Sequence, residues 1–169
     1  VEDITRAVRQ AREWGADILV TSGGASVGEH DLVQRALAAE GLDLSFWRVA
    51  LRPGRPMMHG RLGTMQVLGV PGNPVSSYVC AFLFLVPLVR RLAGRNDVEP
   101  RLDRARLGAS LPANDERADY PRATLADGPD GLVATPLPSQ DSSLMAPLAK
   151  ADCLVIREAR APAAAAGSD

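Results

Sequence analysis

The spacing of apolar residues predicts a helix at the start of the chain and buried strands later in the sequence. The first apolar set has helical spacing and forms one face: Ile4, Ala7, Val8, Ala11 and Trp14. Gly15 stands where a helix commonly ends in a left-handed residue, so we expect a helix over residues 4–14. Apolar runs within residues 16–20 and 65–70 are typical of strands that are buried on both faces. These patterns predict strands that alternate with helices.

The remaining chain divides into further short elements. Helices are predicted over residues 32–39 and 76–93, and Pro87 is expected to kink or divide the second because proline lacks an N–H group. Short strands are predicted over residues 42–49, 57–61, 101–111, 120–125, 132–136 and 152–158. Prolines and aspartates replace the helical pattern within residues 94–99. We therefore expect an α/β domain over residues 1–95, a small β-barrel domain over residues 96–169, and a frayed tail from Ala161.

Composition and charge narrow the classes of protein to which the chain can belong. Hydrophobic residues make up 46% of the 169 residues, which is enough for a packed core. The formal net charge of −1 argues against a protein that coats nucleic acid, because such proteins are normally basic. The apolar window from Val79 to Leu92 is too short to span a bilayer and contains two arginines. We expect neither nucleic acid nor membrane as a partner.

The two cysteines, Cys80 and Cys153, predict buried reduced thiols rather than a disulfide or a metal site. They are far apart in the sequence, lie in apolar surroundings, and have no histidine nearby at ligand spacing. The chain opens on Val1, Glu2 and Asp3, where a secretory signal would need basic residues. A cytoplasmic location is therefore expected.

A loop rich in small residues follows the first predicted strand, over residues 21–31. It reads Thr-Ser-Gly-Gly-Ala-Ser-Val-Gly-Glu-His-Asp. Small residues let the backbone approach a ligand closely, and their N–H and hydroxyl groups can donate to a phosphate. Glu29 and Asp31 add carboxylates of the kind that hold Mg²⁺. An ordinary strand-to-helix turn with Asp31 as the N-cap explains the same residues, so the loop by itself leaves both interpretations open.

A second loop and a group of arginines favour the ligand-binding interpretation. The second loop, residues 71–77, follows the predicted strand 65–70 and reads Pro-Gly-Asn-Pro-Val-Ser-Ser. Two parallel strands that each end in such a loop place both loops at one edge of the sheet, where α/β proteins bind ligands. Between the loops, Arg48, Arg52 and Arg55 supply guanidinium groups that suit bidentate phosphate binding.

These three segments together resemble the molybdopterin molybdenumtransferase family, to which the E domain of gephyrin is related. The matching segments are Ser22–Asp31, Arg52–Pro56 and Val70–Ser76, and their order and spacing agree with the family. The resemblance implies an incomplete three-layer molybdopterin-binding α/β domain of the adenylyltransferase type, followed by a small β-barrel domain. It covers only the C-terminal part of the family's architecture, so we expect a fragment that is inactive by itself. For the full-length protein it implies a homodimer.

The resemblance also implies a reaction and a set of site residues. The family inserts molybdate into adenylylated molybdopterin and releases AMP, with a divalent cation such as Mg²⁺. Asp31 and Glu29 are the implied metal ligands, and Asp31, Arg52 and Arg55 are the implied catalytic residues. The residues implied to bind the substrates are Ser22, Gly23, Gly24, Ser26, Val27, Gly28, Arg48, Pro53, Gly54, Pro71, Gly72, Asn73, Pro74, Ser76 and Ser142. Asp141 stands where the family has a glycine before Ser142, which is a departure from the family's pattern.

Three other functions remain open on the sequence. The related molybdopterin adenylyltransferase shares the α/β domain but has no β-rich domain after it. A non-catalytic binding module of the gephyrin E type would bind a partner peptide without dependence on a nucleotide. A structural part that only packs against the rest of its protein would bind neither AMP nor molybdopterin.

Overall fold

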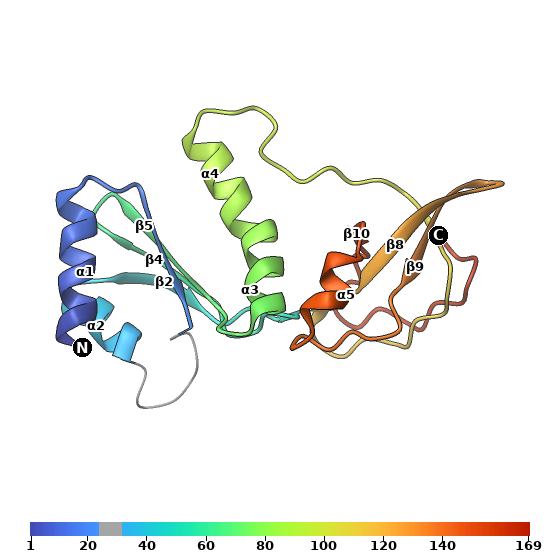
Figure 1. The fold of residues 1–169 in the computed structure, drawn as a ribbon, viewed down its shortest axis with the longest axis horizontal. Coiled ribbons are helices and arrows are strands. Elements are labelled where there is room, and N and C mark those ends of the chain that lie inside the picture. Colours follow the sequence, from blue (N-terminus) through green and yellow to red (C-terminus); the bar gives the residue numbers. More distant parts are fainter. Residues whose placement is uncertain (24–31) are drawn as a thin grey trace. The chain divides into compact units, whose positions relative to one another are not determined.

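The computed structural model describes residues 1–23 and 32–169, which form two compact units (Figure 1). The first unit consists of residues 1–49 and 54–89, and the second of residues 50–53 and 90–169. The domain ranges predicted from the sequence did not anticipate that residues 50–53 belong with the second unit.

A mixed four-stranded sheet forms the centre of the first unit. Its strand order is β1-β5-β4-β2, with bounds β1 Ile18–Ser22, β5 Met65–Val70, β4 Met58–Leu62 and β2 Asp43–Trp47. Strands β1 and β5 run parallel, whereas β4 is antiparallel to both β5 and β2. The expected parallel arrangement is therefore confirmed for β1 and β5, the two strands that end in the glycine loops. The β4–β5 pair is antiparallel because the two strands form a hairpin around residues 63–64.

Helices α1 (Glu2–Glu13) and α2 (Leu32–Ala39) cover one face of this sheet, and α3 lies on the other (Figure 1). Val8 of α1 and Leu37 of α2 pack against Met58 and Val67 of the sheet, and all four are at most 2% exposed. Their burial removes apolar surface from water and holds the helices on the sheet. Gly15 ends α1 with a φ of +69°, the left-handed conformation expected there.

The last helical stretch of the first unit continues into the second unit and consists of three segments. They are α3 (Pro74–Cys80), a π-helical turn (Ala81–Leu85) and α4 (Val86–Leu92). The wide π-helical turn ends two residues before Pro87, whose ring would clash with the carbonyl group four residues earlier in a regular helix. The helix therefore continues through Pro87, and the irregularity predicted near the proline takes the form of this π-helical turn. Of the described helices, only Pro74–Leu92 is long and apolar enough to cross a membrane, a test that core helices of water-soluble proteins also pass.

The second unit is built from short strands. One sheet has the order β10-β8-β9-β6, with bounds β10 Cys153–Leu154, β8 Arg122–Gly128, β9 Gly131–Pro136 and β6 Arg106–Leu107. A second sheet pairs β3 (Leu51–Arg52) with β7 (Ala118–Asp119) in parallel. The short helix α5 (Met145–Ala149) was not predicted. Strands were predicted over residues 101–111 and 152–158. The observed strands are only two residues long, Arg106–Leu107 and Cys153–Leu154, because only these residues pair in the sheet.

The C-terminal residues are held by main-chain hydrogen bonds, so the predicted frayed tail is wrong. Leu111 and Ala164 exchange both of their N–H···O bonds, at 2.8 and 2.9 Å. Further along, the N–H group of Leu107 donates to Ser168 at 2.8 Å, and Gly167 donates back to Leu107 at 2.7 Å. Pairing with residues 107–111 satisfies backbone groups that a frayed tail would leave to water.

Cys80 is expected to resist alkylation in the folded protein. It is 0% exposed, its Sγ lies 3.7 Å from the carbonyl oxygen of Gly54, and burial raises the pKa of the thiol to about 12. Because the thiolate is the reactive form, iodoacetamide at pH 8 should leave Cys80 unmodified, as measured by peptide mass spectrometry. Denaturation with guanidinium chloride serves as the control and should expose the thiol to labelling. Rapid labelling before denaturation would contradict the buried position.

Candidate functional site

The two glycine corners meet at one edge of the sheet. Ser22 and Val70 are the last paired residues of β1 and β5, and the N–H group of Gly23 donates to the carbonyl oxygen of Val70 at 3.0 Å. A Cβ atom added to Gly72 would lie 3.4 Å from the Cα atom of Gly23, which has a φ of +78°. Thr21 Oγ1, on the same strand end, is buried without a hydrogen-bond partner among the described residues. The predicted convergence of the two corners is therefore present.

Part of the first loop lies outside the described residues. This holds for the site residues predicted at Gly24, Ser26, Val27, Gly28, Glu29 and Asp31. Strand β1 ends at Ser22 and α2 begins at Leu32, so these residues connect the converging edge to α2. Their ligand roles stay predictions.

The second loop is organised around the start of α3. Asn73 is the N-cap residue, and its Oδ1 accepts from the N–H group of Ser76 at 3.2 Å. Pro74 follows as the first helical residue, a position at which a missing N–H group removes no hydrogen bond of the helix. Ser76 is buried, whereas Gly72 is exposed. Of the predicted residues in this loop, Gly72 is thus open to a ligand, while Asn73 and Ser76 are used in starting the helix.

Replacing Asn73 with alanine is expected to lower the free energy of unfolding by about 1 kcal/mol, because it removes the acceptor that caps α3. Chemical denaturation followed by circular dichroism measures this change. Asn73→Asp is the matched control, since it keeps the accepting oxygen and should unfold at nearly the wild-type denaturant concentration. Equal losses in both variants would show that the cap contributes nothing.

The three predicted arginines belong to two different units. Arg48 and Arg55 lie in the first unit and are exposed. Arg48 has a φ of +80°, and its guanidinium carbon lies 5.8 Å from the centre of the Trp47 ring. Arg52 lies in the second unit, where its Nη2 donates to Asp119 Oδ2 at 2.7 Å. Sequence reasoning treated the three as one set and did not find the carboxylate that binds Arg52.

Sequence reasoning also missed Arg122, which lies at the start of β8. Its side chain is 0% exposed, yet Nε and Nη1 have no hydrogen-bond partner among the described residues. Only Nη2 finds an acceptor, the carbonyl oxygen of Asp141 at 3.4 Å. Burial lowers the pKa of Arg122, against an opposing effect of the charges on Asp119 and Asp141. A buried guanidinium with unused donors is expensive in free energy, and an anion bound there would satisfy it.

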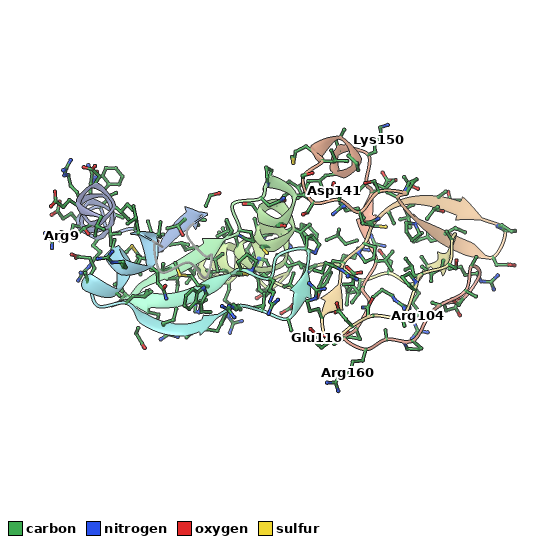
Figure 2. All side chains as sticks on the ribbon, turned by 90° about the horizontal axis from the view of Figure 1, so that it is seen from below. Arg9, Arg104, Glu116, Asp141, Lys150 and Arg160 are labelled. Atoms are coloured by element: carbon green, nitrogen blue, oxygen red, sulfur yellow. The ribbon has the colours of Figure 1, made fainter. Side chains whose placement is uncertain are left out.

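Gln140 holds Arg122 in place from the loop before α5. Its side-chain Oε1 accepts from the N–H group of Arg122 at 2.9 Å, and its Nε2 donates to the Arg122 carbonyl oxygen at 2.9 Å. Asp141, which is labelled in Figure 2, lies in the same loop. Its Oδ1 accepts from both the N–H group and the Oγ of Ser143, each at 2.8 Å. Ser142, one of the predicted site residues, lies between them and is half-buried. We call Arg122, Gln140, Asp141 and Ser142 the Arg122 cluster.

Asp141 fits this loop although glycine was expected there. The hydrogen bonds from Ser143 hold the pKa of its carboxyl below the usual value, and the charge of Arg122 contributes less. Asp141 therefore closes a tight turn and leaves the Nε and Nη1 donors of Arg122 unused. The signal that could have revealed the cluster is a cation inside the predicted strand 120–125, since a buried cation requires a partner.

Comparison with known proteins identifies the family. Residues 1–91 match the family described as "Probable molybdopterin binding domain", which is more than half of the chain. The chain belongs to the molybdopterin-binding domain family. Residues 104–169 match a second family, described as the MoeA C-terminal region (domain IV). The molybdopterin-binding domain is thus followed by the small β domain that the resemblance implied.

Curated relatives bear out the resemblance to the C-terminal part of molybdopterin molybdenumtransferases. The protein of that name from Haemophilus influenzae is 31% identical over 150 residues, which are 88% of this chain and 37% of the relative. The one from Bacillus subtilis is 30% identical over 89% of this chain and 35% of its own length. The chain therefore spans little more than a third of the length of these relatives.

Solved structures agree with the fold. A molybdopterin biosynthesis MoeA protein from Pyrococcus horikoshii superposes with a TM-score of 0.73 at 25% identity, over 97% of this chain and 38% of that one. A molybdenum cofactor biosynthesis protein from Pyrococcus furiosus gives a TM-score of 0.74 at 21% identity, over 98% of this chain and 51% of that one. The fold class expected for the molybdopterin-binding domain and the β domain behind it is confirmed.

Proposed function

We propose that the whole protein is a molybdopterin molybdenumtransferase, which inserts molybdate into adenylylated molybdopterin and releases AMP. The observation that carries this proposal is the succession of two matched families in one chain, the molybdopterin-binding domain and the region after it. The 31% identical relative, over 88% of this chain, has that name. The related adenylyltransferase is disfavoured, because the resemblance gives it no β-rich domain after the α/β domain.

The described residues offer two kinds of anion site for this reaction. At the converging corners, Ser22, Gly23 and Gly72 are small residues at which a phosphoanhydride could approach the backbone closely. In the second unit, the buried Arg122 has Nε and Nη1 donors without a partner among the described residues, and its Nη2 contacts Asp141, the neighbour of Ser142; such donors suit the tetrahedral oxyanion molybdate. Donors fixed before the reaction stabilise charge that develops on phosphate oxygens without reorganising, so no protein nucleophile is required.

The proposed metal ligands are Asp31 and Glu29, whose carboxylate oxygens are the hard donors that Mg²⁺ prefers. Among the described residues, no group of three or more histidine, cysteine, aspartate or glutamate side chains fits a metal ion. A bound Mg²⁺ would neutralise charge on the phosphoanhydride oxygens. In this proposal the protein acts as a cytoplasmic homodimer with molybdopterin and molybdate as its substrates.

The direct test is molybdate-dependent release of AMP by the whole protein from adenylylated molybdopterin, followed by chromatography. AMP should form with molybdate and Mg²⁺, and should not form when sulfate replaces molybdate. Formation of adenylylated molybdopterin from ATP instead would assign the adenylyltransferase reaction. Binding of neither AMP nor molybdopterin in isothermal titration would leave only a structural role.

A further inference from the structure

Three strands of the first sheet end at the edge that carries the glycine corners. Strands β1 and β5 run parallel, and β2 shares their direction because β2 and β5 both pair antiparallel with β4. The register places Trp47 of β2 beside Met58 of β4, and Met58 beside Gly69 of β5. Arg48, the residue after β2, therefore lies at the same edge of the sheet as the two corners.

The distance from Arg48 to the corners follows from the strand pairing. Its N–H group donates to the carbonyl oxygen of Met57 at 2.7 Å. By the same register Met57 stands opposite Val70, which pairs with Ser22. A strand spacing of about 4.8 Å puts Arg48 roughly 10 Å from Val70 and roughly 14 Å from Ser22. A long arginine side chain bridges much of the shorter distance, so one extended ligand on this edge can contact both a corner and the guanidinium.

The backbone of Arg48 adopts a conformation that most side chains disfavour. Its φ is +80°, in the left-handed region where the Cβ atom of an L residue crowds the following carbonyl oxygen. Among the described residues other than glycine, only Arg160, which is labelled in Figure 2, has a comparable φ, at +60°. Strain of this kind persists where the surrounding structure holds it, and it is concentrated at binding sites.

Trp47 supplies a contact that holds the side chain of Arg48. The guanidinium carbon lies 5.8 Å from the centre of the indole ring, which is a cation–π contact. The half-buried ring packs against the core cluster that contains Leu37 and Met58, which are 0% and 1% exposed. A fixed aromatic face thus lies against an exposed guanidinium, and no carboxylate of the described residues is paired with it. The charge of Arg48 therefore stays available to a ligand.

We propose that Trp47 is a positioning residue: its ring orients Arg48 at the edge of the glycine corners, where Arg48 binds the phosphoanhydride of the substrate. Trp47 acts through Arg48 and does not contact the anion itself. This inference rests on the proposed function, because it takes adenylylated molybdopterin as the ligand. It adds Trp47 to the residues that the resemblance implies, and it accounts for the strained backbone of Arg48.

The test is isothermal titration of the whole protein with sodium pyrophosphate in the presence of Mg²⁺, because pyrophosphate is the smallest molecule with a phosphoanhydride. Arg48→Gly should lower the affinity about 10-fold, since it removes charged hydrogen-bond donors. It should leave the Tm equal or higher, since glycine adopts a positive φ without steric conflict. Arg160→Gly is the matched control and should leave both the affinity unchanged and the Tm equal or higher.

Substitutions of Trp47 separate positioning from a structural role. Trp47→Leu should lower the affinity for pyrophosphate about 5-fold, whereas Trp47→Phe keeps a ring face and should stay within about 2-fold of wild type. Adding Trp47→Leu to Arg48→Gly should cause no further loss, since residues that act through one another are non-additive. Thermal unfolding of each variant checks that the fold is retained.

Each outcome supports or overturns a stated part of the proposal. Wild-type affinity in Arg48→Gly overturns anion binding by Arg48. Equal losses in Trp47→Phe and Trp47→Leu, or additive losses in the double variant, overturn the positioning role. If the wild-type protein binds no pyrophosphate, the site at the corners and this inference are both contradicted, while release of AMP still tests the proposed function. Binding of pyrophosphate without release of AMP contradicts the proposed function alone.

Discussion

Replacing Arg122 with methionine should abolish molybdate binding and, at the same time, stabilise the fold. The wild-type guanidinium is completely buried with Nε and Nη1 unbonded, and no ion pair compensates it within the described part of the chain. Methionine has a similar length and removes the cost of burying an unsatisfied cation. We expect the free energy of unfolding to rise by about 1 to 3 kcal/mol, as for other buried charges replaced by apolar residues. Thermal unfolding and isothermal titration with molybdate measure the two effects.

Arg157 offers a matched control in the same unit. It also has a buried Nε without a partner, but its Nη2 donates to the carbonyl oxygens of Pro112, at 3.1 Å, and Pro162. Arg157→Met should therefore destabilise the protein by about 1 to 3 kcal/mol and leave the affinity for molybdate unchanged. If Arg122→Met destabilised the protein as much as Arg157→Met, Arg122 would be a structural residue and the oxyanion site would be wrong.

Replacing Asp31 with alanine should lower the rate of AMP release by at least about 100-fold in the whole protein, because it removes the first proposed ligand of the divalent cation. Molybdate binding should persist, since Arg122 and Ser142 lie in the other unit. AMP release is followed by chromatography at several Mg²⁺ concentrations. Asp127→Ala, at the end of the β8–β9 hairpin, is the control and should retain the wild-type rate. An unchanged rate in Asp31→Ala would count against this residue as a metal ligand.

The elements that could be predicted from the sequence are those whose pattern is local. Helix α2 and strand β5 have the predicted bounds, 32–39 and 65–70, because periodicity and flanking glycines mark them. The convergence of the two glycine corners followed from the parallel pairing of β1 with β5. Strands β3 and β7 have two residues each and carry no pattern of their own. Only their partners, far away in the sequence, define them.

The site residues divide in the same way: some are marked by the sequence around them, and others depend on contacts with distant parts of the chain. Glycines and prolines revealed the loops, because their backbone requirements are local. Burial of Arg122, in contrast, depends on how residues 122 and 140–143 fold together, which no short window of sequence contains. The same applies to Arg52, whose partner Asp119 is found only through pairing of distant strands. Roles for residues 24–31 stay predictions from the sequence.

The assignment of residues 50–53 to the second unit has a consequence for dissecting the protein. The chain passes between the units at three places, namely 49–50, 53–54 and 89–90. One proteolytic cut after Leu92 would therefore leave the halves tethered through β3, and a recombinant piece starting at residue 90 would lack the strand that pairs with β7. Separate expression of the C-terminal half would need residues 50–53 grafted back through a designed linker.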